Sequence, residues 1–289
     1  MPGKSYDLAF HPKPEWTAGP SLLMKRTILL FATLLLLGIT RAEDGYELWL
    51  RYRLIENSQL LAQYRSQVRS IYVPGNAPTL SAIREELTRG LNGLLGKNIP
   101  LQPSLTANAV VAGTPATVKA IEQLPLHSRL RETGKEGFVI ATTSFNGKKC
   151  IVITANTETG VLYGVFHFLR LLQTHQPIQQ LNIASAPRIA HRVLNHWDNL
   201  DRTVERGYAG QSIWDWHRLP GYIDPRYKDY ARANASIGIN GTVLTNVNAN
   251  AWILTDLYLE KVAALAAVFR PYGIRVYLTA RFSAPVEIG

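Results

Sequence analysis

The chain has 289 residues, of which 46% are hydrophobic and 18% charged, so it is globular rather than disordered and long enough for one large or two ordinary domains. The formal net charge is +10, but residues 1–42 carry five basic and two acidic side chains, which leaves +7 for the rest. The basic side chains of the rest of the chain are scattered and form no stripe or tail, which disfavours nucleic acid as the partner. The single cysteine, Cys150, excludes an intrachain disulfide, and no Cys/His spacing indicates a metal site or a metal cofactor.

A targeting segment is predicted near the start of the chain. Lys25 and Arg26 precede an apolar run over 27–40, and a small residue, Ala42, stands before an acidic stretch. This order predicts a signal peptide at about 24–42 that is cleaved after Ala42. The run is short for a membrane span, so we expect no stable membrane association and a secreted or periplasmic protein, with an uncleaved anchor as the alternative.

Three parts of the chain are expected. Residues 1–42 hold an upstream extension, with Met24 as the expected true start, and the signal peptide. Residues 43–185 form a small α/β domain, and the segment 186–289 forms a second region of a different pattern.

Strands and helices alternate in the first folded part. Asn146-Gly147 stands between two apolar runs and predicts a β-hairpin. Asn156 or Thr157 can cap the helix that follows. The predicted elements are a strand at 71–73, a helix over 78–95, a strand at 109–112, a short helix over 118–124, hairpin strands at 138–141 and 150–153, and a helix over 161–172, followed by a link at 176–187.

The second part, 186–289, alternates strands with amphipathic helices, which predicts parallel β/α units. Each predicted strand runs into a polar loop, and active sites of (β/α)8 barrels are built from such carboxyl-terminal strand ends. The predicted elements are strands at 192–197, 241–247 and 274–279 and helices over 225–236 and 257–269.

The predicted fold class is α/β: a small α/β N-terminal domain followed by the first three β/α units of a truncated (β/α)8 TIM barrel. A full barrel needs about 250 residues, and only about 100 remain in this part of the chain. The alternative is a complete three-stranded α/β domain, whose small parallel sheet would be poorly covered.

The densest chemistry lies in residues 196–210, directly after the first of these strands. This stretch holds an indole, several carboxylates, two guanidiniums, an amide and a phenol. Such a loop just past a strand is typical of a site on an α/β scaffold, although an ordinary surface loop has a similar composition.

These residues resemble the α-glucuronidases of glycoside hydrolase family 67. The resemblance covers about 43–289. The residues that carry it are His196-Trp197-Asp198-Asn199-Leu200-Asp201, Glu205-Arg206-Gly207-Tyr208-Ala209-Gly210, Gly238-Ile239-Asn240-Gly241, Asn246-Val247-Asn248-Ala249, Phe282-Ser283-Ala284-Pro285 and, in the first domain, Gly160-Val161-Leu162-Tyr163-Gly164.

The resemblance implies inverting hydrolysis of α-1,2-linked (4-O-methyl)glucuronic acid from xylooligosaccharides, with glucuronoxylan-derived aldouronic acids as substrates and no cofactor. Inversion needs a general acid and a carboxylate base about 6.5–9.5 Å apart. In the family these carboxylates end later barrel strands, so no catalytic residue is expected before Gly289. The fragment alone is therefore expected to be inactive, and the intact enzyme could form a homodimer.

The resemblance also implies part of a substrate pocket. Trp197 would stack on the sugar or its 4-O-methyl group, and Val247 would supply an apolar contact. Glu205 and Arg206 would hydrogen-bond the uronic acid, since arginine suits bidentate carboxylate binding. The other candidates, which would shape the loops or contact the ligand, are Asp198, Asn199, Asn246 and Asn248.

Other interpretations stay open at this stage. Trp197 could be a barrel-core indole, and Glu205 and Arg206 could form an ordinary salt-bridged loop. The chain could be a non-catalytic carbohydrate-binding fragment that keeps some affinity through Trp197. A nucleic-acid-binding protein driven by positive charge would instead show a steep salt dependence of DNA binding.

Overall fold

The computed structural model describes residues 21–37, 43–207 and 210–289. The chain divides into two compact units, Met1–Tyr46 and Glu47–Gly289. In the first unit, helix α1 (Leu22–Leu37) contains most of the apolar run of the predicted signal peptide. The extension up to residue 20 and the predicted cleavage after Ala42 lie outside the described residues. None of the helices in the described ranges has the length and hydropathy that a membrane crossing requires.

The second unit contains two sheets, and the first is mixed. Its strands β1, β2 and β4 run parallel, whereas β3 is antiparallel to both β4 and β5. In spatial order the strands are β1 (Ser70–Tyr72), β2 (Ala109–Ala112), β4 (Lys148–Thr154), β3 (Phe138–Phe145) and β5 (Asn182–Ser185).

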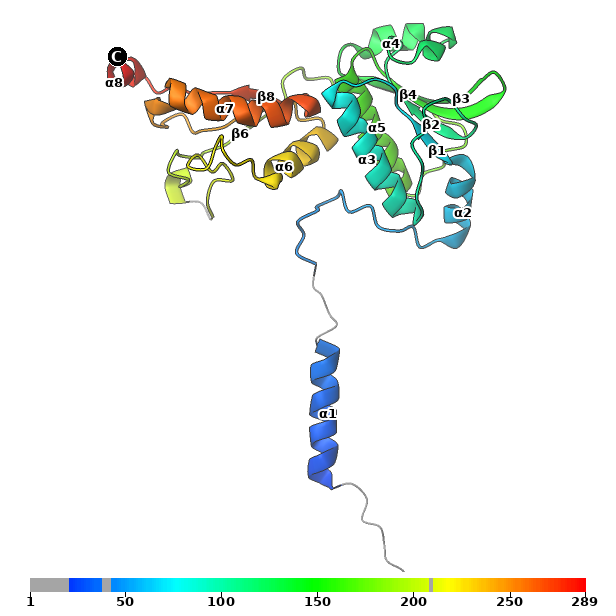
Figure 1. Ribbon diagram of the computed structural model, residues 1–289, viewed down its shortest axis with the longest axis horizontal. Helices are drawn as coiled ribbons and strands as arrows, with labels where there is room; N and C mark the ends of the chain where they lie inside the picture. The colour runs from blue at the N-terminus through cyan, green and yellow to red at the C-terminus, as the bar shows by residue number, and fades with distance from the viewer. Residues whose placement is uncertain (1–20, 38–42, 208–209) are drawn as a thin grey trace, which may run out of the picture. The chain divides into compact units, whose positions relative to one another are not determined.

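Helices cover both faces of this sheet because its central strands are apolar on both sides. Helices α3 (Pro78–Leu95) and α5 (Glu158–Gln173) lie side by side over one face (Figure 1), where Val110 and Ile153 join their core. The other face, with Val111, is covered by the elements α4 (His127–Thr133) and η1 (Lys119–Gln123). Helix α2 (Ser58–Gln67) begins at an Asn57 cap and precedes β1.

Local chemistry explains two of these elements. Asn146 and Gly147 both have positive φ, as a two-residue type I′ hairpin loop requires, and Phe145 pairs with Lys148 across it. The Thr157 hydroxyl accepts a hydrogen bond from the Gly160 N–H at 3.2 Å and caps α5. A Cβ atom on Gly160 would lie 2.6 Å from the Gly137 carbonyl oxygen, so only glycine allows this helix to approach the sheet so closely.

The second sheet is parallel, with order β6-β7-β8. Helix α6 (Pro225–Ser236) joins the first two strands and α7 (Asp256–Phe269) the last two, and a short helix, α8 (Ala284–Ile288), follows. Trp214 and Trp216, from the loop after β6, are fully buried in the same core. The strands are β6 (Val193–Asn195), β7 (Gly241–Val243) and β8 (Arg275–Tyr277), and short 3₁₀ turns lie at Glu205–Gly207, Ala251–Leu254 and Arg270–Tyr272.

Two polar clusters join the elements around the first sheet to the second part of the unit. Glu86 of α3 accepts hydrogen bonds from Arg232 of α6 at 2.8 and 2.9 Å and from the Tyr52 hydroxyl at 2.6 Å, and Glu86 is only 2% exposed. Glu136, before β3, pairs with Arg192 at 2.5 Å and accepts from Asn240 at 3.0 Å. Because both clusters span the junction, the two sheets are held by ion pairs as well as by a shared apolar core.

Several predicted elements need correction. The supposed link at 176–187 contains an edge strand, β5, and helices α2 and α4 were not predicted. The short helix expected over 118–124 is the 3₁₀ turn Lys119–Gln123. The three parallel strands are shorter than predicted because their last residues turn into loops. Two β/α crossovers and a third strand are present among the described residues, whereas the expected third unit ends in the five-residue α8.

Candidate functional site

The predicted site residues gather at the carboxyl-terminal ends of β6 and β7. Trp197 and Asp198 follow β6, and the segment 246–248 follows β7. These strands are parallel neighbours, so both loops emerge at the same edge of the sheet. We refer to Trp197, Glu205, Arg206, Val247 and Asn248 as the strand-end surface.

Trp197 is the largest side chain of this surface and is 40% exposed. The Arg206 guanidinium lies over its ring, 5.6 Å from the centroid, within the range of a cation–π interaction. The Glu205 N–H donates to the Trp197 carbonyl at 2.8 Å, which fixes the turn that brings Arg206 back over the indole. Arg206 has a φ of 63°, a left-handed conformation that a residue other than glycine rarely adopts.

A second contact joins the two loops. The Asn248 amide donates to a Glu205 carboxylate oxygen at 3.2 Å. Val247 lies between the two asparagines of its loop and is 59% exposed. Neither Glu205 nor Arg206 forms an ion pair with a residue in the described ranges, so the guanidinium over Trp197 keeps its charge available to an anion.

The geometry of the remaining candidates shows that they hold the loops in place. Asn246 is 2% exposed, and its amide donates to the Asp198 carbonyl at 3.3 Å and to the Asn199 side-chain oxygen at 2.5 Å. Its own side-chain oxygen accepts from the Asn248 N–H at 2.6 Å. Asp198 is 6% exposed, and Asn199 bonds Thr203. Asp198, Asn199 and Asn246 therefore link and shape the two loops.

A half-buried histidine, His196, lies behind these loops. Nε2 of His196 is 2.8 Å from the Tyr230 hydroxyl, which in turn is 2.9 Å from the Thr242 hydroxyl of β7. Its Nδ1 is 3.9 Å from the Asp198 carboxylate. Burial lowers the pKa of His196, and the nearby Asp198 carboxylate acts in the opposite direction. The histidine thus anchors the start of the β6 loop to helix α6 and strand β7.

This arrangement has groups that can bind a ligand but few groups that could catalyse a reaction. An indole face, a guanidinium, an amide and a carboxylate suit the faces and polar edges of a sugar acid. Of the two carboxylates among the candidate residues, Asp198 is buried and Glu205 is engaged by Asn248. No group of three or more His, Cys, Asp or Glu residues within the described ranges has the geometry of a metal site.

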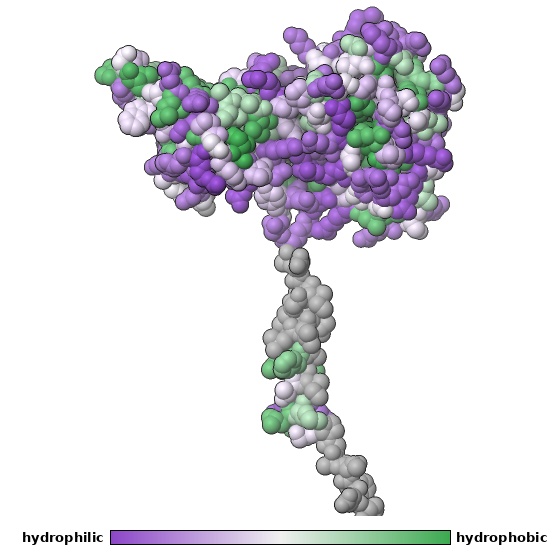
Figure 2. Space-filling model, viewed as in Figure 1, coloured by the Kyte–Doolittle hydropathy of each residue, from purple (hydrophilic) through white to green (hydrophobic). Residues whose placement is uncertain are grey.

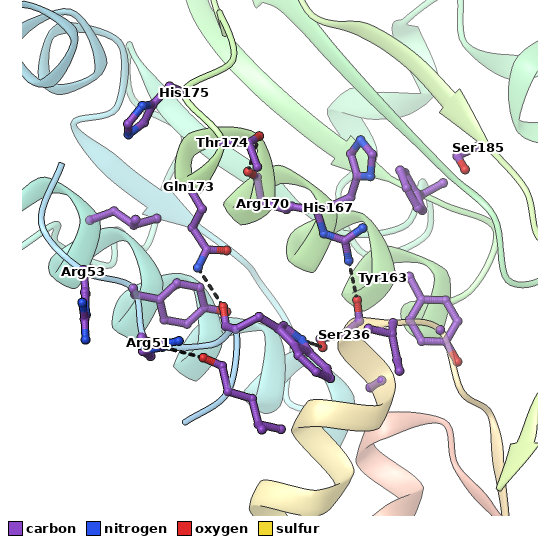
Figure 3. A pocket seen from close by; sticks show the side chains of 18 of the residues that line it. Arg51, Arg53, Tyr163, His167, Arg170, Gln173, Thr174, His175, Ser185 and Ser236 are labelled. Atoms are coloured by element: carbon purple, nitrogen blue, oxygen red, sulfur yellow. Dashed lines mark hydrogen bonds between the residues drawn. The ribbon is translucent and has the colours of Figure 1, made fainter. Parts of the chain in front are cut away.

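Sequence reasoning missed a second polar cluster, on α5. Tyr163, His167 and Arg170 line a cavity (Figure 3) whose lining also includes Arg192 and Gly238, just before strands β6 and β7. Their spacing of four and three residues on an otherwise apolar helix is the sequence signal that could have revealed a polar stripe.

Comparison with known proteins points to the same family as the strand-end motifs. Residues 48–168 match the glycosyl hydrolase family 67 N-terminus and residues 171–289 the glycosyl hydrolase family 67 middle domain. A "Probable alpha-glucuronidase A" of Neosartorya fischeri is 35% identical over 274 residues, covering 91% of this chain and 31% of the relative. An "Alpha-glucuronidase A" of Emericella nidulans is 34% identical over 277 residues, with 92% and 31% covered.

A solved structure supports the fold. It is a family GH115 4-O-methyl-alpha-glucuronidase with specificity for decorated arabinogalactans, matched with a TM-score of 0.52 at 17% identity over 72% of this chain and 28% of that one. Two family models side by side along the chain place it among the glycosyl hydrolases. The chain belongs to glycosyl hydrolase family 67, and it spans about 31% of the length of the curated relatives it matches.

Proposed function

We propose that this chain is the substrate-binding first part of an α-glucuronidase that removes α-1,2-linked (4-O-methyl)glucuronic acid from xylooligosaccharides with inversion of configuration. Membership of family 67 and relatives named alpha-glucuronidase support the activity. The observation that carries the proposal is the pair of Trp197 and Arg206 at the ends of parallel strands, with the guanidinium 5.6 Å from the indole centroid.

Each member of the strand-end surface has a proposed role. Trp197 stacks on the apolar face of the sugar or on its 4-O-methyl group, and the exposed Val247 adds an apolar contact. Arg206 binds the uronic acid carboxylate, for which a guanidinium is well suited. Glu205 and Asn248, already joined at 3.2 Å, contact sugar hydroxyls. Asp198, Asn199 and Asn246 hold the loops in place.

We also propose that the second sheet is the beginning of a (β/α)8 barrel, with the small α/β domain over 43–185 and the barrel from 186 onward. Val193 and Leu194 of β6 are 36% and 37% exposed, although parallel strands are normally covered on both faces. Figure 2 shows apolar side chains at the surface around the C-terminal α8, where Phe282 and Val286 are almost fully exposed. Further β/α units would cover such surfaces.

Inverting hydrolysis requires two carboxyl groups about 6.5–9.5 Å apart, one as general acid and one as base. Asp198 is buried behind the loop, and Glu205 is held by Asn248, so neither is proposed for these roles. We place the acid and base on later strands of a chain as long as the relatives. The residues described here bind and orient the uronic acid and do not hydrolyse it.

The test is an assay of the 289-residue chain with aldouronic acids of defined length. We expect no release of glucuronic acid above the buffer control, because binding residues without an acid and a base do not cleave the bond. Turnover well above background would show that carboxylates within this chain perform the reaction and would overturn the assignment of roles. Binding without turnover in a chain as long as the relatives would favour a non-catalytic carbohydrate-binding function.

A secreted or periplasmic location is part of the same proposal. The basic Lys25 and Arg26 and the apolar α1 support an exported protein. N-terminal sequencing of the exported protein should then begin at Glu43, and a mature protein that retains residues 24–42 would show an uncleaved anchor instead.

A further inference from the structure

A cavity of about 940 Å³ lies between helix α5, the segment 48–56 and the C-terminal end of α6 (Figure 3). Its lining includes Arg192 and Gly238, which precede β6 and β7, so it lies at the amino-terminal ends of these strands. The strand-end surface lies at the opposite ends and is a separate site. The volume is in the range of sites for small organic ligands.

One wall of the cavity is a polar stripe on an apolar helix. Tyr163, His167, Arg170 and Thr174 recur at intervals of four, three and four residues, which places them on one face of α5 and just past its end. Most of the other residues of this helix are buried in the core. The stripe therefore faces the cavity, and core packing alone does not explain its polar residue types.

The cavity is rich in positive charge. Four arginines and two glutamates line it, and one of those glutamates, Glu136, is already paired with Arg192 at 2.5 Å. Arg170 donates one hydrogen bond, to the Ser236 carbonyl at 2.9 Å, and its Nε and Nη1 have no partner among the described residues. Burial and the neighbouring Arg170 lower the pKa of His167. A bound carboxylate would pair with the Arg170 guanidinium.

Tyr163 adds a largely buried ring to the lining of the cavity. It is 7% exposed, and its hydroxyl is buried near Arg192 and Glu136. Trp49, 46% exposed, adds an indole to the lining.

We propose that this junction cavity binds a carboxylate-bearing saccharide, with Arg170 on the carboxylate. A simple inorganic anion would fill only a small part of about 940 Å³, whereas hydroxyl, amide and indole groups beside a guanidinium suit a sugar acid. The site goes beyond the proposed function, because it is a second site on a surface that contains none of the strand-end residues.

The experiment follows the His167 imidazole resonance by NMR in the 289-residue chain, assigned with His167→Gln, while aldotetraouronic acid is added. We expect a saturable shift and a raised pKa of His167, since the bound carboxylate stabilises the imidazolium. Arg170→Gln should weaken this binding about tenfold or more, and Arg170→Lys should recover part of it. The matched control Arg218→Gln, an arginine stacked on Tyr222, should leave it unchanged.

Further arms separate this site from the strand-end surface. Trp197→Ala should leave the His167 response intact. Loss of the His167 response in that variant would show that the cavity is not a separate site. An equal response to neutral xylotetraose would contradict carboxylate recognition, and an equal response to inorganic phosphate would contradict a saccharide site. No His167 response, with a Trp197 response preserved, would remove this site and leave the proposed function standing. Dispersed amide spectra of each variant confirm that it folds.

Discussion

At the scale of single residues, the candidate site separates into binding groups and loop-holding groups. Trp197, Arg206 and Val247 are exposed at the surface, whereas Asn246 is almost completely buried and its side chain bonds three partners in the loops. The sequence placed all of these residues at strand ends. It could not separate the two groups, because asparagines that bind a sugar and asparagines that hold a turn have the same composition and spacing.

Two half-buried histidines, His167 and His196, give a prediction about pH. Burial lowers the pKa of His196, against the pull of Asp198, and burial with Arg170 lowers the pKa of His167, both from an ordinary 6.5. The unfolded chain therefore binds more protons than the folded chain just below pH 6.5, so the free energy of unfolding should fall as the pH falls through this range. Urea unfolding at a series of pH values between about 7.5 and 5.5 measures this change in the free energy of unfolding.

The same measurement has a matched control. His167→Gln should flatten the pH dependence, whereas replacement of the exposed His127 by glutamine should not. A free energy of unfolding that rises on acidification through pH 6.5 would contradict the assignment of neutral, half-buried histidines.

At the scale of elements, the sequence predicted best where a pattern is local. The helix at Pro78–Leu95 and the hairpin around Asn146-Gly147 follow from apolar periodicity and turn chemistry alone. Strand β5 was missed because Asn182–Ser185 is a short, largely exposed edge strand whose pairing partner lies about 45 residues earlier in the chain. The cavity was missed for a similar reason, since its walls come from several segments that are distant in the sequence.

Helices α3 and α6 offer a paired test of how the junction is held. Glu86 is 2% exposed and bonds Arg232 and Tyr52, while its neighbour Glu85 forms an exposed pair with Lys228 at 2.6 Å. Glu86→Ala leaves a buried guanidinium without its partner and should cost about 3–5 kcal/mol. Glu85→Ala should cost about 1 kcal/mol or less, because an exposed pair contributes little.

Chemical denaturation of the two variants provides the comparison. Similar small losses for both would mean that the buried pair does not hold α6 against α3, and that the shared apolar core alone joins the two parts.

At the scale of the whole molecule, unit Glu47–Gly289 joins a covered mixed sheet to a parallel sheet with exposed strand residues. The first sheet is apolar on both faces and is covered by helices on both. The second presents the strand-end surface and lies within the residues that match the family 67 middle domain. We therefore propose that this chain binds the uronic acid and that hydrolysis needs the whole enzyme.

The most direct measurement is the response of the Trp197 indole N–H resonance to aldotetraouronic acid, assigned by its absence in Trp197→Ala. We expect a saturable shift and a binding that Arg206→Gln weakens about tenfold, because the proposed role of the guanidinium over the indole is to bind the carboxylate. Trp252, a second exposed indole at 58%, should not respond. If Trp197 stays unperturbed while the chain is folded, or if xylotetraose without uronic acid shifts it equally, the strand-end surface is not the uronic acid site.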